Sequence, residues 1–157
     1  MLRAISRSVG AAARKPRQIT ADRRGMALIE FVFVSPVLLM MGIGLIKFGL
    51  AVSQYLMLTN AAAQGVNYFA LSRGTSTPYD STITAITGAA PSLTAATITK
   101  TLKVNGTACT TNTGCQTALV AGATALVIAT YPCDLTVMGV NFKSGCTLTA
   151  QSAQMVQ

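Results

Sequence analysis

The chain contains no histidine and no tryptophan, and acidic residues are scarce. Four of the 157 residues are Asp or Glu, and three of them, Glu30, Asp80 and Asp134, lie beyond residue 25. A carboxylate pair for hydrolysis, a Ser/His or Cys/His nucleophile and a histidine-containing metal site are therefore hard to assemble. We predict no enzymatic activity, no catalytic residues, no metal and no cofactor.

Charged residues make up 10% of the chain and hydrophobic residues 51%, whereas soluble domains have roughly 25% charged residues. The net charge of +8 is unevenly divided, because residues 1–25 hold seven basic residues against Asp22, a balance of +6. The five other basic residues are scattered, without the basic face of a nucleic-acid site, so we expect no nucleic-acid partner. The composition of residues 1–24 also suits a mitochondrial presequence, which stays open as an alternative.

A long apolar run follows this basic segment. Met26–Ile46 would form a helix of about 32 Å, close to the roughly 30 Å hydrocarbon thickness of a bilayer. The run is too long for the apolar part of a signal peptide, and no A-x-A cleavage site follows it. We predict a single membrane pass with the N-terminus in the cytoplasm and the remainder outside.

Several residues within this run break its uniformity. Pro36 lacks an N–H group and should kink the helix, and the hydroxyl of Ser35 is available to freed backbone groups. Gly42, Gly44 and Gly49 would leave smooth patches that another helix can approach closely, although such glycines are also common in membrane helices.

Glu30 needs an explanation, because a carboxylate at mid-membrane depth costs roughly 2.5–3.5 kcal/mol. If the chain stays intact, Arg23 or Arg24 could pair with Glu30 near the cytoplasmic interface. If the chain is cut after Gly25, Met26 gains a free amine and Glu30 becomes the fifth residue. The carboxylate could then pair with its own or a neighbour's amine and set the register of an assembly.

The helical pattern continues beyond the membrane run. Apolar residues recur at alternating steps of three and four from Leu45 to Phe69, and Arg73-Gly74 provides a stop. We therefore predict one helix over Met26–Ser72, whose outer half covers the sheet of its own domain.

The C-terminal half predicts a small domain. Thr75–Tyr79 has the composition of a linker, and Asp80-Ser81 could cap a short helix that ends near Thr87. Two segments, 98–104 and 147–156, alternate as strands do, and Asn105-Gly106 makes a turn after the first. A third segment, 124–131, is rich in strand-forming residues with apolar residues on both faces, as expected of a central strand. The predicted fold is α+β, with a long helix, a short second helix and an antiparallel sheet of about three strands.

Four cysteines, Cys109, Cys115, Cys133 and Cys146, lie in this half. An even number of cysteines outside the cytoplasm suggests disulfides, with three possible connectivities. We favour the local pairs Cys109–Cys115 and Cys133–Cys146. A four-cysteine zinc site is the alternative, but the spacing differs from the usual C-x2-C knuckles.

These residues resemble a known family. The segment from Gly25 to Phe31 is similar to the processing site of type IV pilin-like precursors, which a prepilin peptidase cuts after the glycine. Further similarity to TadE-like pseudopilins of the tight-adherence (Tad, Flp) pilus lies in Glu30-Phe31, Ser35-Pro36, Phe48-Gly49, Leu58–Ala62, Gly65, Thr130–Pro132 and Cys146–Ala150. The chain departs from the family in having Lys47-Phe48-Gly49-Leu50 where an acid precedes Phe-Gly-Arg, and Ala63-Gln64-Gly65 where Arg-Glu-Gly is common.

The resemblance implies a pilin-like minor pilin that is cleaved between Gly25 and Met26. Glu30, Phe31 and Pro36 would then set the register of the helix in assembly. Implied partners are the prepilin peptidase, sibling pseudopilins, the major Flp pilin, the inner-membrane pilus platform and the lipid bilayer. The corresponding division of the chain is a cleaved leader at 1–25, a membrane helix at 26–48, its outer continuation at 49–74 and a disulfide-containing domain at 75–157.

The competing hypothesis is an uncut single-pass membrane anchor. In that case the basic tail is a permanent cytoplasmic segment, and the outer domain binds something unrelated to pili.

Overall fold

The computed structural model describes residues 23–137 and 139–157, and it has the predicted α+β class. The expected leader at 1–25 falls almost entirely outside the described residues. The helices and strands follow along the chain as α1 (Arg23–Leu71), α2 (Pro78–Ala89), β1 (Thr99–Val104), β2 (Thr107–Cys109), α3 (Asn112–Ala118), β3 (Thr124–Pro132), β4 (Thr136–Val137), β5 (Val140–Asn141) and β6 (Thr147–Met155).

Helix α1 is one continuous element that includes Pro36. It ends one residue before the predicted Ser72, and the Arg73-Gly74 stop is explained by backbone conformation. Gly74 has a φ of +79°, which a glycine adopts without steric cost, and the amide of Thr75 donates to the Ser72 carbonyl at 3.1 Å.

The main sheet is antiparallel, with the strand order β2-β1-β3-β6. The three predicted strands correspond to β1, β3 and β6, and the number is corrected to four because β2 was missed. The Asn105-Gly106 turn joins β1 to β2 with φ angles of 50° and 84°, and these positive values suit the tight hairpin that Asn-Gly favours. A strand of only three residues carries too little periodicity to be recognised.

Two further elements were also missed, namely the short helix α3 and the β4–β5 ribbon. The ribbon pairs Thr136 with Asn141 and Val137 with Val140, and it forms a separate two-stranded sheet. Its strands are two residues long, so no alternation could reveal them.

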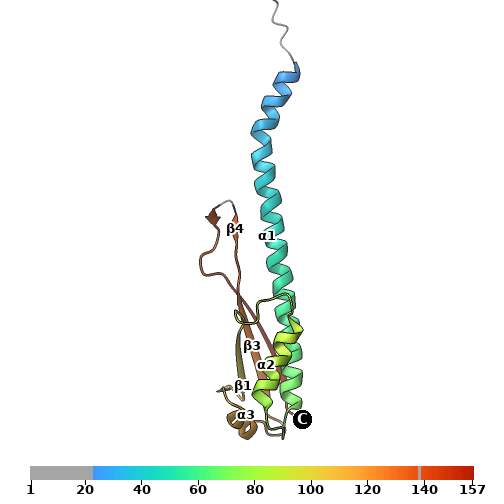
Figure 1. Cartoon of the computed structure of the whole chain (residues 1–157), viewed down its shortest axis with the longest axis vertical. Coiled ribbons are helices and arrows are strands. Elements are labelled where there is room, and N and C mark those ends of the chain that lie inside the picture. The colour runs from blue at the N-terminus through green and yellow to red at the C-terminus, as the bar shows by residue number, and fades with distance from the viewer. Residues whose placement is uncertain (1–22, 138) are drawn as a thin grey trace, which may run out of the picture. The chain divides into compact units, whose positions relative to one another are not determined.

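The hydrophobic core lies between the C-terminal part of α1, α2 and one face of the main sheet. Figure 1 shows α2 beside the green end of α1, with the sheet alongside. Alternate residues of β3 point inward, as expected for an interior strand, and Val127 is fully buried. The core side chains of α1 are Leu58, Ala61, Ala62, Val66, Phe69 and Ala70.

Gly65 lies where these layers approach most closely. A Cβ atom built at this position would overlap Cγ1 of Ile86 in α2 and lie 3.6 Å from Cγ1 of Val127 in β3. Glycine therefore allows α2 to pack directly on the α1 backbone.

The predicted cap of the short helix was wrong. α2 begins at Pro78, whose missing N–H group suits the first helical turn, and Thr77 occupies the N-cap position without a side-chain hydrogen bond. Asp80 lies within the first turn instead of before it.

Candidate functional site

The predicted processing site lies in the first turns of α1. Gly25 and Met26 are exposed, and a Cβ atom at Gly25 would meet nothing within 4 Å. The structure therefore shows open space beside the Cα atom of Gly25. Cleavage itself stays a prediction.

Glu30, Phe31 and Pro36 are also exposed on α1. Glu30 follows Met26 by four residues, so the two lie on the same helix face about 5–6 Å apart between Cβ atoms. That spacing would let a carboxylate reach an amine at residue 26. The alternative pairing with Arg23 or Arg24 involves side chains outside the described part of the structure.

The N-terminal half of α1 has exposed apolar side chains on all faces. Between Met26 and Leu50 these include Phe31, Phe33, Leu38 and Ile46. Among the described residues, one helix is long and apolar enough to cross a membrane, and it is this one. A helix that is hydrophobic all round is typical of lipid surroundings, and it suggests a membrane anchor.

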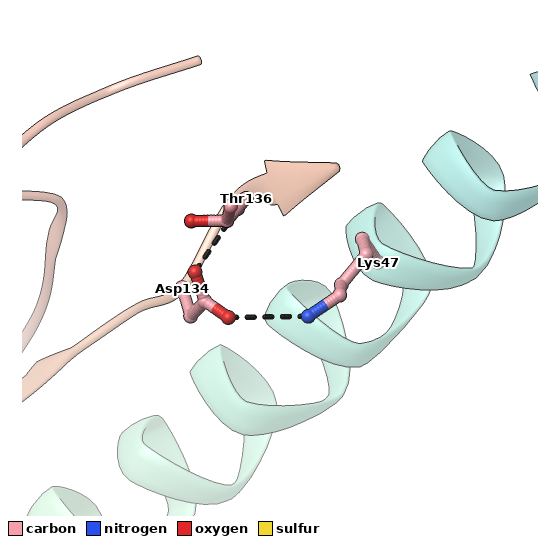
Figure 2. Close-up of polar contacts among 3 residues, drawn as sticks. All are labelled: Lys47, Asp134 and Thr136. Carbon is pink, nitrogen blue, oxygen red and sulfur yellow. Dashed lines mark hydrogen bonds and ion pairs between the residues drawn. The ribbon is translucent and has the colours of Figure 1, made fainter. Parts of the chain in front are cut away.

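An ion pair joins α1 to the segment that follows β3. Nζ of Lys47 donates to a carboxylate oxygen of Asp134 at 3.1 Å, and the amide of Thr136 donates to the other oxygen at 3.0 Å (Figure 2). The hydroxyl and then the amide of Thr136, followed by Lys47, lower the pKa of Asp134 from 3.8 to about 2.

The cysteines form two disulfides, Cys109–Cys115 and Cys133–Cys146. This is the local pairing favoured above, and it leaves no free thiol among the four. The zinc alternative is wrong, because zinc needs thiolate ligands. The first disulfide joins the end of β2 to α3, and the second encloses the segment that contains β4 and β5.

Sequence inspection missed the position of that second loop. Leu135, Val137 and Phe142 line cavities together with Gly44 and Phe48 of α1. The apolar residues between Cys133 and Cys146 were the available signal, but their position beside α1 depends on tertiary structure.

In the described part of the chain, a candidate membrane helix followed by a small, disulfide-containing α+β domain defines the class of this protein. Within that class, the family model described as "TadE-like protein" matches residues 25–67. The match confirms the resemblance for this segment and supports the assignment of the chain to the TadE-like proteins of the Tad pilus system. The chain matches no curated protein and no solved structure at a significant level.

The matched range begins at Gly25, includes Glu30 and Gly65, and ends at Asn67. The similarity noted in Thr130–Pro132 and Cys146–Ala150 lies beyond it and stays a prediction. Similarity to this family over residues 25–67 suggests involvement in the Tad pilus system, with other pilus components as partners, and the apolar part of α1 suggests a membrane component.

Proposed function

We propose that this protein is a minor pilin, or pseudopilin, that acts in the initiation, priming or tip of a Flp/Tad pilus for surface adhesion. The observation that carries the proposal is the family match beginning at Gly25, on a helix whose exposed apolar surface includes the acid Glu30. An acid with no function would be disfavoured at this place, because a carboxylate in or near lipid is costly.

In this proposal the N-terminus faces the cytoplasm, and the C-terminal domain faces the periplasm or the exterior. Prepilin peptidase removes residues 1–25, and the amine of Met26 becomes available to a carboxylate one helical turn away. Glu30, Phe31 and Pro36 then fix the position of the helix against sibling pseudopilins, the major Flp pilin and the inner-membrane platform.

The first experiment is N-terminal sequencing and intact-mass measurement of the protein from host membranes, with and without the peptidase. A chain that starts at Met26, and at Met1 when the peptidase is absent, supports the proposal. A start at Met1 in both strains would instead support the uncut single-pass anchor.

A second experiment tests the acid. Glu30→Gln keeps the size of the side chain and removes its charge, so we expect normal protein level, normal cleavage and loss of pili. Met41→Ala is a matched control, because Met41 is also exposed in the apolar part of α1. Normal piliation with Glu30→Gln would contradict a register function for the carboxylate.

A further inference from the structure

The β4–β5 ribbon extends away from the four-stranded sheet and lies along α1 (Figure 1). Phe142 and Val137 share one cavity with Gly44 and another with Met40. The ribbon therefore reaches the part of α1 that the predicted membrane span contains.

The position of the ribbon along α1 gives its depth in the membrane. Met40 lies six residues before Ile46, the end of the predicted span, which corresponds to about 9 Å at the rise of an α-helix. Apolar groups that bind a bilayer interface are buried about 5–10 Å into it. Val137, Val140 and Phe142, which line a cavity with Met40, therefore lie at a comparable depth beside the membrane helix.

Val137 and Val140 of the ribbon, and Phe142 directly after it, are the apolar residues at this depth. Phe142 is 73% exposed and Val140 is 61% exposed, and Val137 is half-buried. Large exposed apolar groups on a protein surface mark contact with another protein or a membrane. Here the exposed groups are continuous with the apolar surface of α1.

The space between the ribbon and α1 is also apolar. A cavity of about 270 Å³ lies there, lined by Val137 and Phe142, and a neighbouring cavity of about 290 Å³ lies between α1 and the Cys133–Cys146 disulfide. Phe48 and Leu135 line both cavities. Protein side chains leave these volumes open, and an acyl chain has the chemistry to fill them.

Polar groups flank these apolar residues. The Lys47–Asp134 pair lies one residue beyond Ile46, and Lys143 directly follows Phe142. Lysines at the ends of membrane segments extend their ammonium groups to the headgroups. Both bases are therefore placed for the water interface, with the apolar residues of the ribbon on its membrane side.

Backbone pairing makes insertion of the ribbon less costly. Val137 pairs with Val140 and Thr136 with Asn141, and the Phe142 amide donates to the Leu135 carbonyl at 3.4 Å. Backbone polar groups that enter lipid must find partners within the protein. The ribbon meets part of that requirement, because the backbone groups that face each other across its two strands are paired.

We propose that Val137, Val140 and Phe142 insert among the lipid acyl chains of the leaflet at the C-terminal end of the α1 span, which is the outer leaflet in the proposed orientation. The Cys133–Cys146 segment is thus a second membrane contact that sets the height of the outer domain. The inference rests on the membrane anchorage proposed for α1, and it is independent of any function in pili.

The absence of tryptophan provides a direct test. Phe142→Trp introduces one tryptophan directly after β5 in the full chain, which is reconstituted at low protein density in neutral phosphatidylcholine vesicles. Phe33→Trp, in the apolar part of α1, reports on the anchor, and Tyr68→Trp, 49% exposed in the outer part of α1, is the aqueous control. Fluorescence is measured with lipids brominated at shallow or deep acyl positions.

We expect quenching of Phe142→Trp, stronger with shallow than with deep bromines, while Tyr68→Trp stays unquenched. An unquenched Phe142→Trp beside a quenched Phe33→Trp would overturn the inference and leave the anchor intact. An unquenched Phe33→Trp would overturn both the anchorage and the inference. If the emission of Phe142→Trp changes only at high protein density, without quenching, this residue contacts a second copy and the lipid proposal is wrong.

Discussion

Asn112 caps the first turn of α2 from a distant position in the sequence, and it is joined there to Asp80. Its Oδ1 accepts hydrogen bonds from the amides of Tyr79 and Asp80 at 3.0 and 3.1 Å, and its Nδ2 donates to Oδ2 of Asp80 at 2.8 Å. The preceding residue, Thr111, caps α3, because its Oγ1 accepts from the Gly114 amide at 3.1 Å. Two consecutive residues thus accept hydrogen bonds from backbone amides in the first turns of two helices, which have no partner within the helix.

Replacing Asn112 should destabilise the outer domain. Asn112→Ala removes the acceptor from two helix amides, and loss of an N-cap typically costs about 1 kcal/mol. We expect this decrease in the free energy of unfolding of the full chain in detergent, together with faster hydrogen exchange at Tyr79 and Asp80.

Thr113→Ala is a matched control, since Thr113 is the exposed neighbour of Asn112 in α3. Unchanged amide exchange at Tyr79 and Asp80 in Asn112→Ala would show that the distant cap does not stabilise α2.

Gly65→Ala should destabilise the packing of α2 on α1. The new methyl group would overlap Ile86, which is fully buried and cannot move into solvent. Overpacking a core typically costs about 1–3 kcal/mol, and we expect a loss in this range from denaturant unfolding in detergent.

Gly49→Ala provides the comparison, because a Cβ atom at Gly49 meets nothing within 4 Å. The variant should be as stable as the wild type or slightly more stable. In a double-mutant cycle, Gly65→Ala should cost less in an Ile86→Ala background. Equal losses of stability in both backgrounds would show that the new methyl group does not clash with Ile86.

The sequence predicted the elements with strong periodicity. It predicted α1 because the apolar run is long and is followed by a helical stripe, the apolar residues that recur every three or four positions from Leu45 to Phe69. It predicted β6 because alternate residues, including the buried Ala150, face the core. The stripe was only partly a core face: Val66 and Phe69 are buried, whereas Leu45 and Phe48 are exposed. Period alone cannot distinguish a face that covers a sheet from one that meets lipid.

The missed features depend on contacts between distant residues. The cap of α2 was assigned to Asp80-Ser81 because local chemistry suggested it, but the acceptor came from Asn112. The ion pair of Lys47 with Asp134 joins residues 87 positions apart. The local sequence does not identify either contact, because both form only when elements that are distant in the sequence pack together.

The two disulfides should act on different parts of the domain. Cys109–Cys115 encloses Asn112, so Cys109→Ser with Cys115→Ser should cost about 2 kcal/mol and speed amide exchange at Tyr79 and Asp80. Cys133→Ser with Cys146→Ser should leave that exchange unchanged and instead loosen the β4–β5 ribbon.

Mass spectrometry after alkylation checks the starting state. The exported protein should contain no free thiols, and reduction should expose four. Faster exchange at Tyr79 after loss of Cys133–Cys146 would show that the two loops are not independent.

Asp134 should titrate at low pH, and Thr136 should lower the pKa of its carboxyl group more than Lys47 does. The folded-state pKa of about 2 lies below the ordinary value of 3.8. The ionised carboxylate therefore favours the folded contacts fully above about pH 3.8, and this contribution is lost as the pH falls toward 2.

Carbon-detected NMR titration of the full chain in micelles measures the pKa of Asp134 directly. Thr136→Val should raise it more than Lys47→Met, because the hydroxyl of Thr136 is the largest cause of the shift. A larger effect of Lys47→Met would show that the charge on α1, and not the local turn, holds the carboxylate ionised.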